Sequence, residues 1–298
     1  MASSQADLIN DFAENALFWA GVPMQPTSDG FKNVFEKVVS IDALKKLTGL
    51  DAPLTEVAVE TSLGSTDLSV FGGKMTVPQD KANALGGKDA YFEQRLKQIL
   101  PYTAQNFETS LYYNELRPYA KKLLQEVSAG GTTVDEQYSM VCIQWFPGET
   151  TGLYNPEGFG DGKVFETFWY NGGNLYDVAA NVPGYGMFVK SNFGLQLEGD
   201  RHCASIVNID LGDDGSGGFL AMPTGNQIDD MLDSVRAMPQ NTVILAHPRV
   251  IRATSVYKRA VLRMGPNDDS YPGALSDWDG IPFVGSYNLS KGTEAVVA

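Results

Sequence analysis

The chain has 298 residues, of which 43% are hydrophobic and 19% charged, so it is long enough to bury a substantial core and too apolar to be disordered. Its 22 Lys and Arg residues against 36 Asp and Glu residues give a net charge of −14, which disfavours binding to nucleic acid through its phosphates. The sequence contains no run of about 18 apolar residues that could cross a membrane, and its start carries acids where a secretory signal carries basic residues. We therefore expect an unprocessed, cytoplasmic start.

The first 50 residues are expected to form short helices joined by helix breakers. Residues 4–20 place apolar side chains on one face at helical spacing, and a Gly and two Pro residues follow. A second helical pattern covers residues 31–38, and Ser40 is placed as the N-cap of a helix over residues 41–47. This pattern is more typical of an arm laid over a surface than of a compact unit.

Residues 54–78 change to the alternating pattern of a β-hairpin. Residues 57–60 alternate apolar and polar side chains, residues 64–67 (GSTD) are turn formers, and residues 68–70 resume the strand pattern. An isolated hairpin is marginally stable in water, and this one has few large apolar side chains. We therefore expect it to need a partner surface.

The rest of the chain predicts one long broken helix followed by a mixture of strands and helices. Residues 88–128 have helical spacing interrupted by Pro101, which is expected to kink or end the helix. The mixture of elements after residue 128 gives an α+β class. Strands are predicted at 137–146, 165–170, 186–198, 202–211, 241–246, 281–287 and 294–297, and helices at 225–238 and 248–264.

No set of catalytic or metal-binding residues stands out in the sequence. The acidic loop 210–215 lacks the bidentate Glu of a calcium loop, and residues 158–163 (GFGDGK) depart from the spacing of a phosphate loop. Cys142 and Cys203 are interpreted as buried free thiols, and His247 as a structural histidine where a strand meets a helix. We predict no catalytic residue, no cofactor and no metal ligand.

Three segments resemble a known protein family. Residues 137–162 (QYSMVCIQWFPGETTGLYNPEGFGDG) and 184–211 (GYGMFVKSNFGLQLEGDRHCASIVNIDL) are similar to major capsid proteins of short-tailed phages of the epsilon-fifteen type. In that family a strand ending in Trp leads to a Tyr-Pro-x-Gly turn, which here contains the inserted Asn155. The closing segment 278–297 (WDGIPFVGSYNLSKGTEAVV) resembles the family's closing Gly-Ile-Pro strand. The order of the segments adds to the similarity.

The resemblance implies a Hong Kong 97-like phage capsid fold of the α+β class. Trp278 is expected to pack where the chain returns from the axial to the peripheral domain, with Pro282 at the start or edge of a late strand. The implied parts are an N-terminal arm (1–50), an extended β-hairpin loop (51–85), a peripheral domain with a spine helix (86–135), a mostly axial domain with some return to the peripheral domain (136–275), and closing strands of the peripheral domain (276–298).

The resemblance implies a major capsid protein, which is a structural subunit and not an enzyme. Such a chain assembles into hexamers and pentamers of an icosahedral shell that encloses double-stranded DNA without binding it specifically. Candidate partners are other copies of the chain, a separate scaffolding protein, a portal and a decoration protein, with no membrane involved. The chain would be made in the host cytoplasm and located in the virion. Two alternatives stay open: another virion component, such as a decoration or tail protein, and a β-rich carbohydrate-active enzyme.

Apolar side chains on the arm and the hairpin are the candidate contacts between subunits. The hairpin has too few large apolar residues to form a core of its own, and the arm resembles a segment laid over a surface. The alternative for each residue is packing within its own chain. The candidates are Leu8, Phe12, Leu17, Phe18 and Trp19 on the arm, and Val57, Val59, Leu68 and Val70 on the hairpin.

Overall fold

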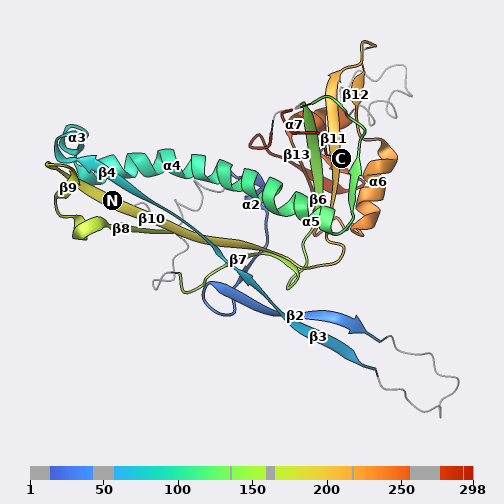
Figure 1. Cartoon of the computed structure of the whole chain (residues 1–298), viewed down its shortest axis with the longest axis horizontal. Coiled ribbons are helices and arrows are strands. Elements are labelled where there is room, and N and C mark those ends of the chain that lie inside the picture. Colours follow the sequence, from blue (N-terminus) through green and yellow to red (C-terminus); the bar gives the residue numbers. More distant parts are fainter. Residues whose placement is uncertain are drawn as a thin grey trace.

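The computed structural model describes residues 14–42, 57–134, 136–158, 165–216, 218–255, 276–290 and 292–297. A long helix lies along a narrow sheet, a second sheet flanked by helices stands at one end of that helix, and a two-stranded ribbon projects away from both (Figure 1). None of the helices in these ranges is long and apolar enough to span a membrane.

The arm contributes one short helix and two strands to the described chain. They are α2 (Leu17–Ala20), β1 (Met24–Pro26) and β2 (Lys32–Ile41). The helix predicted for residues 31–38 is therefore wrong, because β2 pairs antiparallel with β3 (Val59–Asp67). Apolar residues three and four apart fit either structure over so short a run, and the β-branched side chains of this segment favour the strand. The helix predicted for 41–47 lies mostly outside the described residues.

The predicted hairpin turn at residues 64–67 is also wrong. Strand β3 continues through these residues, and Gly64 pairs with Phe35 of β2. A Cβ on Gly64 would lie 2.7 Å from the Phe35 ring, so the glycine gives that ring the space to lie across the neighbouring strand. The hairpin is therefore the β2–β3 ribbon. The next strand, β4 (Ser69–Pro78), leaves it and pairs with β10 (Val182–Leu197).

Residues 126–128, predicted as the end of a long broken helix, instead form the strand β5 (Glu126–Ser128). The rest of that helix is confirmed. It consists of α4 (Lys88–Ser110), a π-helical turn η1 (Leu111–Leu116) and α5 (Arg117–Lys122), preceded by the short α3 (Gln79–Ala84). Pro101 does not end the helix, since α4 continues through it. The apolar face of α4 packs on β4 and β10 through buried side chains that include Phe92 and Leu96. We call α4, η1 and α5 the spine.

Strand β10 is the centre of the narrow sheet. It pairs antiparallel with β4 from Gly184–Pro78 to Phe193–Ser69, and at its far end with β7. The strand order is β1-β7-β10-β4, with β8 and β9 also paired to β10. The remaining strands of this sheet are β7 (Thr150–Tyr154), β8 (Phe165–Trp169) and β9 (Tyr176–Ala179). The sheet has strands at 165–169 and 182–197 close to where the sequence predicts them, whereas the sequence does not predict β7.

The second sheet has the strand order β12-β11-β6-β13-β15-β14, with β5 paired to β11. Its central strand β6 is buried at every position, with one face toward the spine and the other toward α6 and α7. The predicted strands at 137–146, 202–211, 241–246 and 281–287 and the predicted helix at 225–238 are confirmed. The elements are β5 (Glu126–Ser128), β6 (Gln137–Gln144), β11 (Cys203–Asp213), β12 (Phe219–Ala221), α6 (Gly225–Ser234), β13 (Thr242–Ala246), α7 (Pro248–Thr254), β14 (Asp277–Trp278) and β15 (Ile281–Gly285).

Cys142 and Cys203 are both buried and free, as predicted. In the pairing of β6 with β11, Cys142 lies opposite Ala204, and Cys203 lies opposite Ile143. Because paired residues of an antiparallel sheet share a face, the two thiols point to opposite faces. A disulfide between them would require a change of register.

Trp278 packs against the second sheet and α6. Its indole Nε1 donates a hydrogen bond to Asp229 Oδ1 at 2.7 Å, and its side chain adds to the core formed with α6. Pro282 lies at the start of β15, as predicted, before the pairing with β13 begins at Phe283. The return of the chain to the spine comes after β15, where Ser286 bonds to Glu108 of α4.

Candidate assembly surfaces

The β2–β3 ribbon is fastened to the rest of the molecule through one of its faces. The amide of Asn33 donates to Gln196 Oε1 at 2.7 Å, and Lys37 Nζ forms an ion pair with Glu198 Oε2 at 3.1 Å. Asn33 and Lys37 lie on the same face because they are four residues apart in a strand. Their partners lie at the end of β10, so the base of the ribbon is held while the rest projects (Figure 1).

The opposite face of the ribbon exposes apolar side chains. Val34 lies opposite Ser65, and the alternation of strand β3 places Leu63 and Val59 on the same face as Ser65. Leu63 is 82% exposed, Val59 56% and Val34 42%. We call these three residues the apolar face of the ribbon. An exposed row of this kind on a two-stranded sheet is typical of a surface that another chain covers.

The candidate contact residues are divided between the surface and the interior of the chain. Leu17, Val57, Val59 and Val70 are exposed and remain available to a neighbour. Phe18, Trp19 and Leu68 are buried within the chain itself, which is the alternative that the sequence left open. Leu8 and Phe12 lie outside the described residues. Whether any of the nine contacts a neighbouring subunit stays a prediction.

Sequence reasoning missed two residues of the apolar face, Val34 and Leu63. It placed Val34 on a helix and put the turn directly after Leu63. The sequence carries little signal for this face, because the polar Glu36 and Ser65 share it with the apolar side chains. Only the register of the two strands places Val34 and Leu63 on one face.

Glu108 joins the arm, the spine and the closing segment. This carboxylate is fully buried and accepts hydrogen bonds from Phe18 N at 2.7 Å, Ser286 Oγ at 2.8 Å and Asn288 Nδ2. The neighbouring Trp19 packs edge-on against Phe107, with ring centroids 4.8 Å apart. These contacts explain why Phe18 and Trp19 are buried in the chain. The sequence gives no sign of them, because the partners are about 90 and 180 residues apart.

A second polar cluster fastens the closing segment to the spine. Arg117 Nη1 lies 2.9 Å from Glu294 Oε2, and the hydroxyl of Tyr113 donates to Glu294 Oε1 at 2.7 Å. Burial raises the pKa of Glu294 above its ordinary value, and the Arg117 guanidinium opposes that shift. Burial also raises the pKa of the Tyr113 phenol, with the Glu294 carboxylate adding to the effect. The cluster is a structural clasp between the spine and the closing residues Ser290 and Glu294.

Three titratable side chains outside these clusters are held by local contacts or by burial. His247 Nδ1 accepts a hydrogen bond from Arg249 N at 3.1 Å and so caps α7, which agrees with the structural role predicted for this histidine. Burial lowers the pKa of His202, while the carboxylates of Glu149 and Asp200 oppose that shift. Asp214 accepts from two backbone amides of its own loop. Within the described ranges, no three His, Cys, Asp or Glu side chains are grouped as metal ligands.

Comparison with known proteins gives a fold but no relative in sequence. No family model matches the chain, and no curated protein matches it. Among solved structures, a chain of bacteriophage Epsilon15 is similar with a TM-score of 0.60 at 16% identity, over 89% of this chain and 85% of that one. A chain of the bacteriophage JBD30 capsid is similar with a TM-score of 0.52 at 9% identity, over 93% of this chain and 90% of that one. The expected α+β phage capsid fold is therefore confirmed.

Proposed function

We propose that this chain is the major capsid protein of a bacteriophage, a structural subunit whose activity is assembly. The observation that carries the proposal is the fold shared with phage structures over nearly the whole chain, including the Epsilon15 chain at 89% coverage. The extended shape supports it, because an exposed apolar face on a projecting ribbon is typical of a surface that a neighbouring chain covers.

In this proposal the ribbon lies against a neighbouring copy, and the copies form hexamers and pentamers of a closed icosahedral shell. Val34, Val59 and Leu63 of the apolar face, with the exposed Leu17, Val57 and Val70, are the proposed contacts. Each such contact buries little area, so its effect on a single pair of subunits is small. Closure of the shell makes the contacts cooperative, because each subunit is then held by several neighbours at once.

The charge of the chain is consistent with an enclosing role. A net charge of −14 repels double-stranded DNA, so the proposed shell would surround the genome without gripping its phosphates. We propose that assembly also uses a separate scaffolding protein, a portal and a decoration protein, that synthesis takes place in the host cytoplasm, and that the finished location is the virion. The proposal assigns no catalytic residue and no cofactor to the chain.

Sedimentation velocity and electron microscopy of the full-length chain, alone and with its phage's scaffolding protein, test this function. We expect rings of five or six subunits or closed shells in at least one of these conditions. A decoration protein would instead bind to shells made by another protein, and a tail protein would form tubes or fibres. Small particles under every condition, together with release of sugars from a glycan substrate, would support the carbohydrate-active enzyme.

A further inference from the structure

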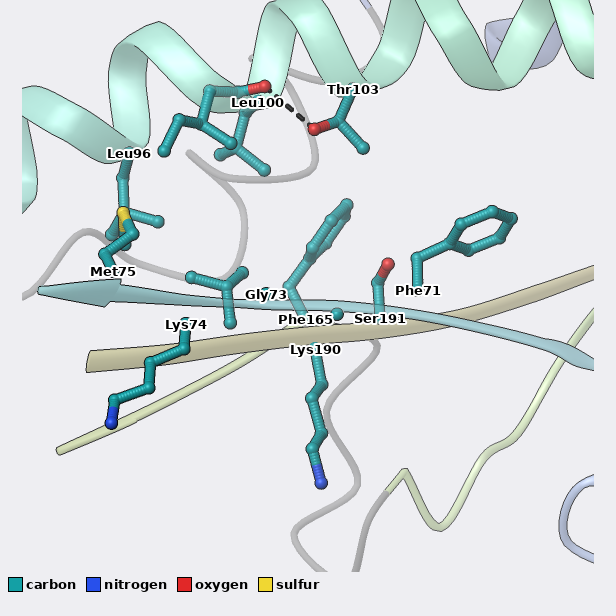
Figure 2. A pocket seen from close by; sticks show the side chains of 13 residues that line it. Phe71, Gly73, Lys74, Met75, Leu96, Leu100, Thr103, Phe165, Lys190 and Ser191 are labelled. Carbon is teal, nitrogen blue, oxygen red and sulfur yellow. Dashed lines mark hydrogen bonds between the residues drawn. The ribbon is translucent and has the colours of Figure 1, made fainter. Parts of the chain in front are cut away.

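A pocket of about 370 Å³ lies between helix α4 and the strands β4 and β10 (Figure 2). Leu96 and Leu100 of α4 form one wall, and the rings of Phe71 and Phe165 lie on the side of the strands. The volume is in the range of sites that hold a small ligand or a few side chains, about 300–1,000 Å³. We call this the α4 pocket.

The α4 pocket is apolar and open because of the residues that β4 places there. Lys74 and Lys190 extend from their strands away from α4, so their charges lie on the other side of the sheet (Figure 2). Gly73 faces the pocket, and a Cβ added to it would meet no heavy atom within 4 Å. Its φ is not positive, so a larger residue fits the backbone there. The pocket therefore suits apolar side chains supplied from elsewhere.

The first described residues lie against α4, beyond the end of this pocket. The carbonyl of Asn15 accepts a hydrogen bond from Asn288 Nδ2 at 2.8 Å, and the same Nδ2 bonds to Glu108 of α4. Glu108 follows Leu100 of the pocket by about 12 Å along the helix.

A chain of aromatic rings connects Trp19 to the pocket. The ring of Trp19 lies 4.8 Å from that of Phe107 and 5.5 Å from that of Phe193. Phe107 in turn lies 5.1 Å from Phe71, and Phe193 lies 5.3 Å from Phe165. One ring therefore separates Trp19 from each of the two aromatic residues that line the pocket. The segment that precedes the described chain starts within reach of it.

Residues 1–13 have the composition that the pocket requires. Leu8, Ile9 and Phe12 recur at helical spacing, and the segment contains no Lys or Arg. A helix of ten residues is about 15 Å long, which is enough to extend from the region of Trp19 along α4 to the pocket. We propose that residues 4–13 dock in the α4 pocket of their own chain, with Leu8 and Phe12 filling it. This docking goes beyond the proposed function, since it concerns the single subunit before assembly.

Hydrogen exchange of the full-length, unassembled chain, read by mass spectrometry, tests the docking. We expect the amides of residues 5–13 to exchange slowly, and at least about tenfold faster in Gly73→Leu, because the new side chain fills the pocket. The matched control is Thr76→Leu, which adds the same side chain to the exposed opposite face of β4 and should leave the protection unchanged. Phe12→Ser removes the docking side chain without altering the pocket and should also speed the exchange.

Exchange in α4 and β10 reports whether each variant keeps the fold. The docking is overturned if residues 5–13 exchange as fast as an unstructured peptide in the unchanged chain, or if their protection survives both Gly73→Leu and Phe12→Ser. Protection that appears only in assembled shells would mean that a neighbour's segment fills the pocket, which also contradicts docking within one chain. The measurement is made on the chain before assembly. The docking can therefore be disproved while the capsid function stands, and the capsid function can be disproved while the docking stands.

Discussion

Glu108 is a buried residue whose loss should weaken the chain without changing its surface. Replacing it by Leu removes the acceptor of three hydrogen bonds and leaves the buried Phe18 amide without its partner. A buried donor left unpaired costs about 1–3 kcal/mol, so the free energy of unfolding should fall by at least that amount. Urea denaturation of the unassembled chain measures this.

Two other variants serve as controls for Glu108. Glu108→Gln keeps one acceptor oxygen and should lose less stability than Glu108→Leu. Glu93→Gln removes a carboxylate from a surface pair with Lys97 on the same helix, and should change the free energy of unfolding by less than about 1 kcal/mol. Equal losses in all three variants would contradict the stabilising role of the Glu108 hydrogen bonds.

The ion pair of Arg117 with Glu294 should show the behaviour of a buried pair. Both side chains are largely buried, so Glu294→Leu alone leaves Arg117 without its partner and should cost about 3 kcal/mol of unfolding free energy. The double variant Arg117→Met with Glu294→Leu replaces both charges by apolar groups and should recover much of that loss. A double-mutant cycle in urea measures the difference, and simple additivity would show that the two side chains are not coupled.

The lowered pKa of His202 predicts that the stability of the folded chain depends on pH. Its pKa in the folded chain is lowered by burial from the ordinary value of 6.5, so the unfolded chain binds the proton more tightly. The folded chain should therefore lose stability as the pH falls from above 6.5 through the lowered pKa, and keep it above 6.5. His202→Gln should reduce this loss, measured as the midpoint of thermal unfolding against pH. An unchanged slope in the variant would assign the effect to other groups.

At the scale of elements, the sequence was informative where a pattern is local and ambiguous where it depends on a distant partner. Strand β6 and helix α6 were predictable, because a continuous apolar run and a helical stripe each define one element. The ribbon was predicted in the wrong place. The spacing of residues 31–38 fits a helix or a strand, and only pairing with residues 59–67 decides between them.

The candidate site was less predictable than the fold. Burial of Phe18 and Trp19 depends on contacts with Glu108 and Phe107, far away in the sequence. Apolar side chains in an arm look the same whether a neighbour or their own chain covers them. Exposure of Leu63 could be found only after the register of the ribbon was known.

The exposure of the apolar face of the ribbon predicts that one substitution there affects assembly but not folding stability. Leu63 is 82% exposed in the single chain, so Leu63→Glu should change its unfolding free energy by no more than about 0.5 kcal/mol. The same change should prevent assembly, because it places a charge in the proposed interface. Ser62→Glu, on the fastened face beside Lys37, is the matched control and should still assemble. Light scattering during assembly compares the two variants. Unimpaired assembly of Leu63→Glu would show that the apolar face of the ribbon is not part of the interface.

For the whole molecule, the three cores are joined into one extended subunit that leaves the ribbon outside. The largest core contains residues of the arm, the spine and both sheets, whereas Val34, Val59 and Leu63 of the ribbon belong to none of the three cores. A subunit built in this way can hold its body rigid while the ribbon engages another copy. The architecture is consistent with the proposed assembly role.

Cryo-electron microscopy of particles formed by the full-length chain with the proposed scaffolding protein tests the proposed assembly most directly. We expect closed icosahedral shells in which the ribbon of each subunit crosses a neighbouring subunit, with Val34, Val59 and Leu63 covered. Shells in which these three side chains stay exposed to solvent would contradict the assigned contact. If the chain formed no shell and instead bound to the surface of shells built by another protein, its role as the major capsid protein would be refuted.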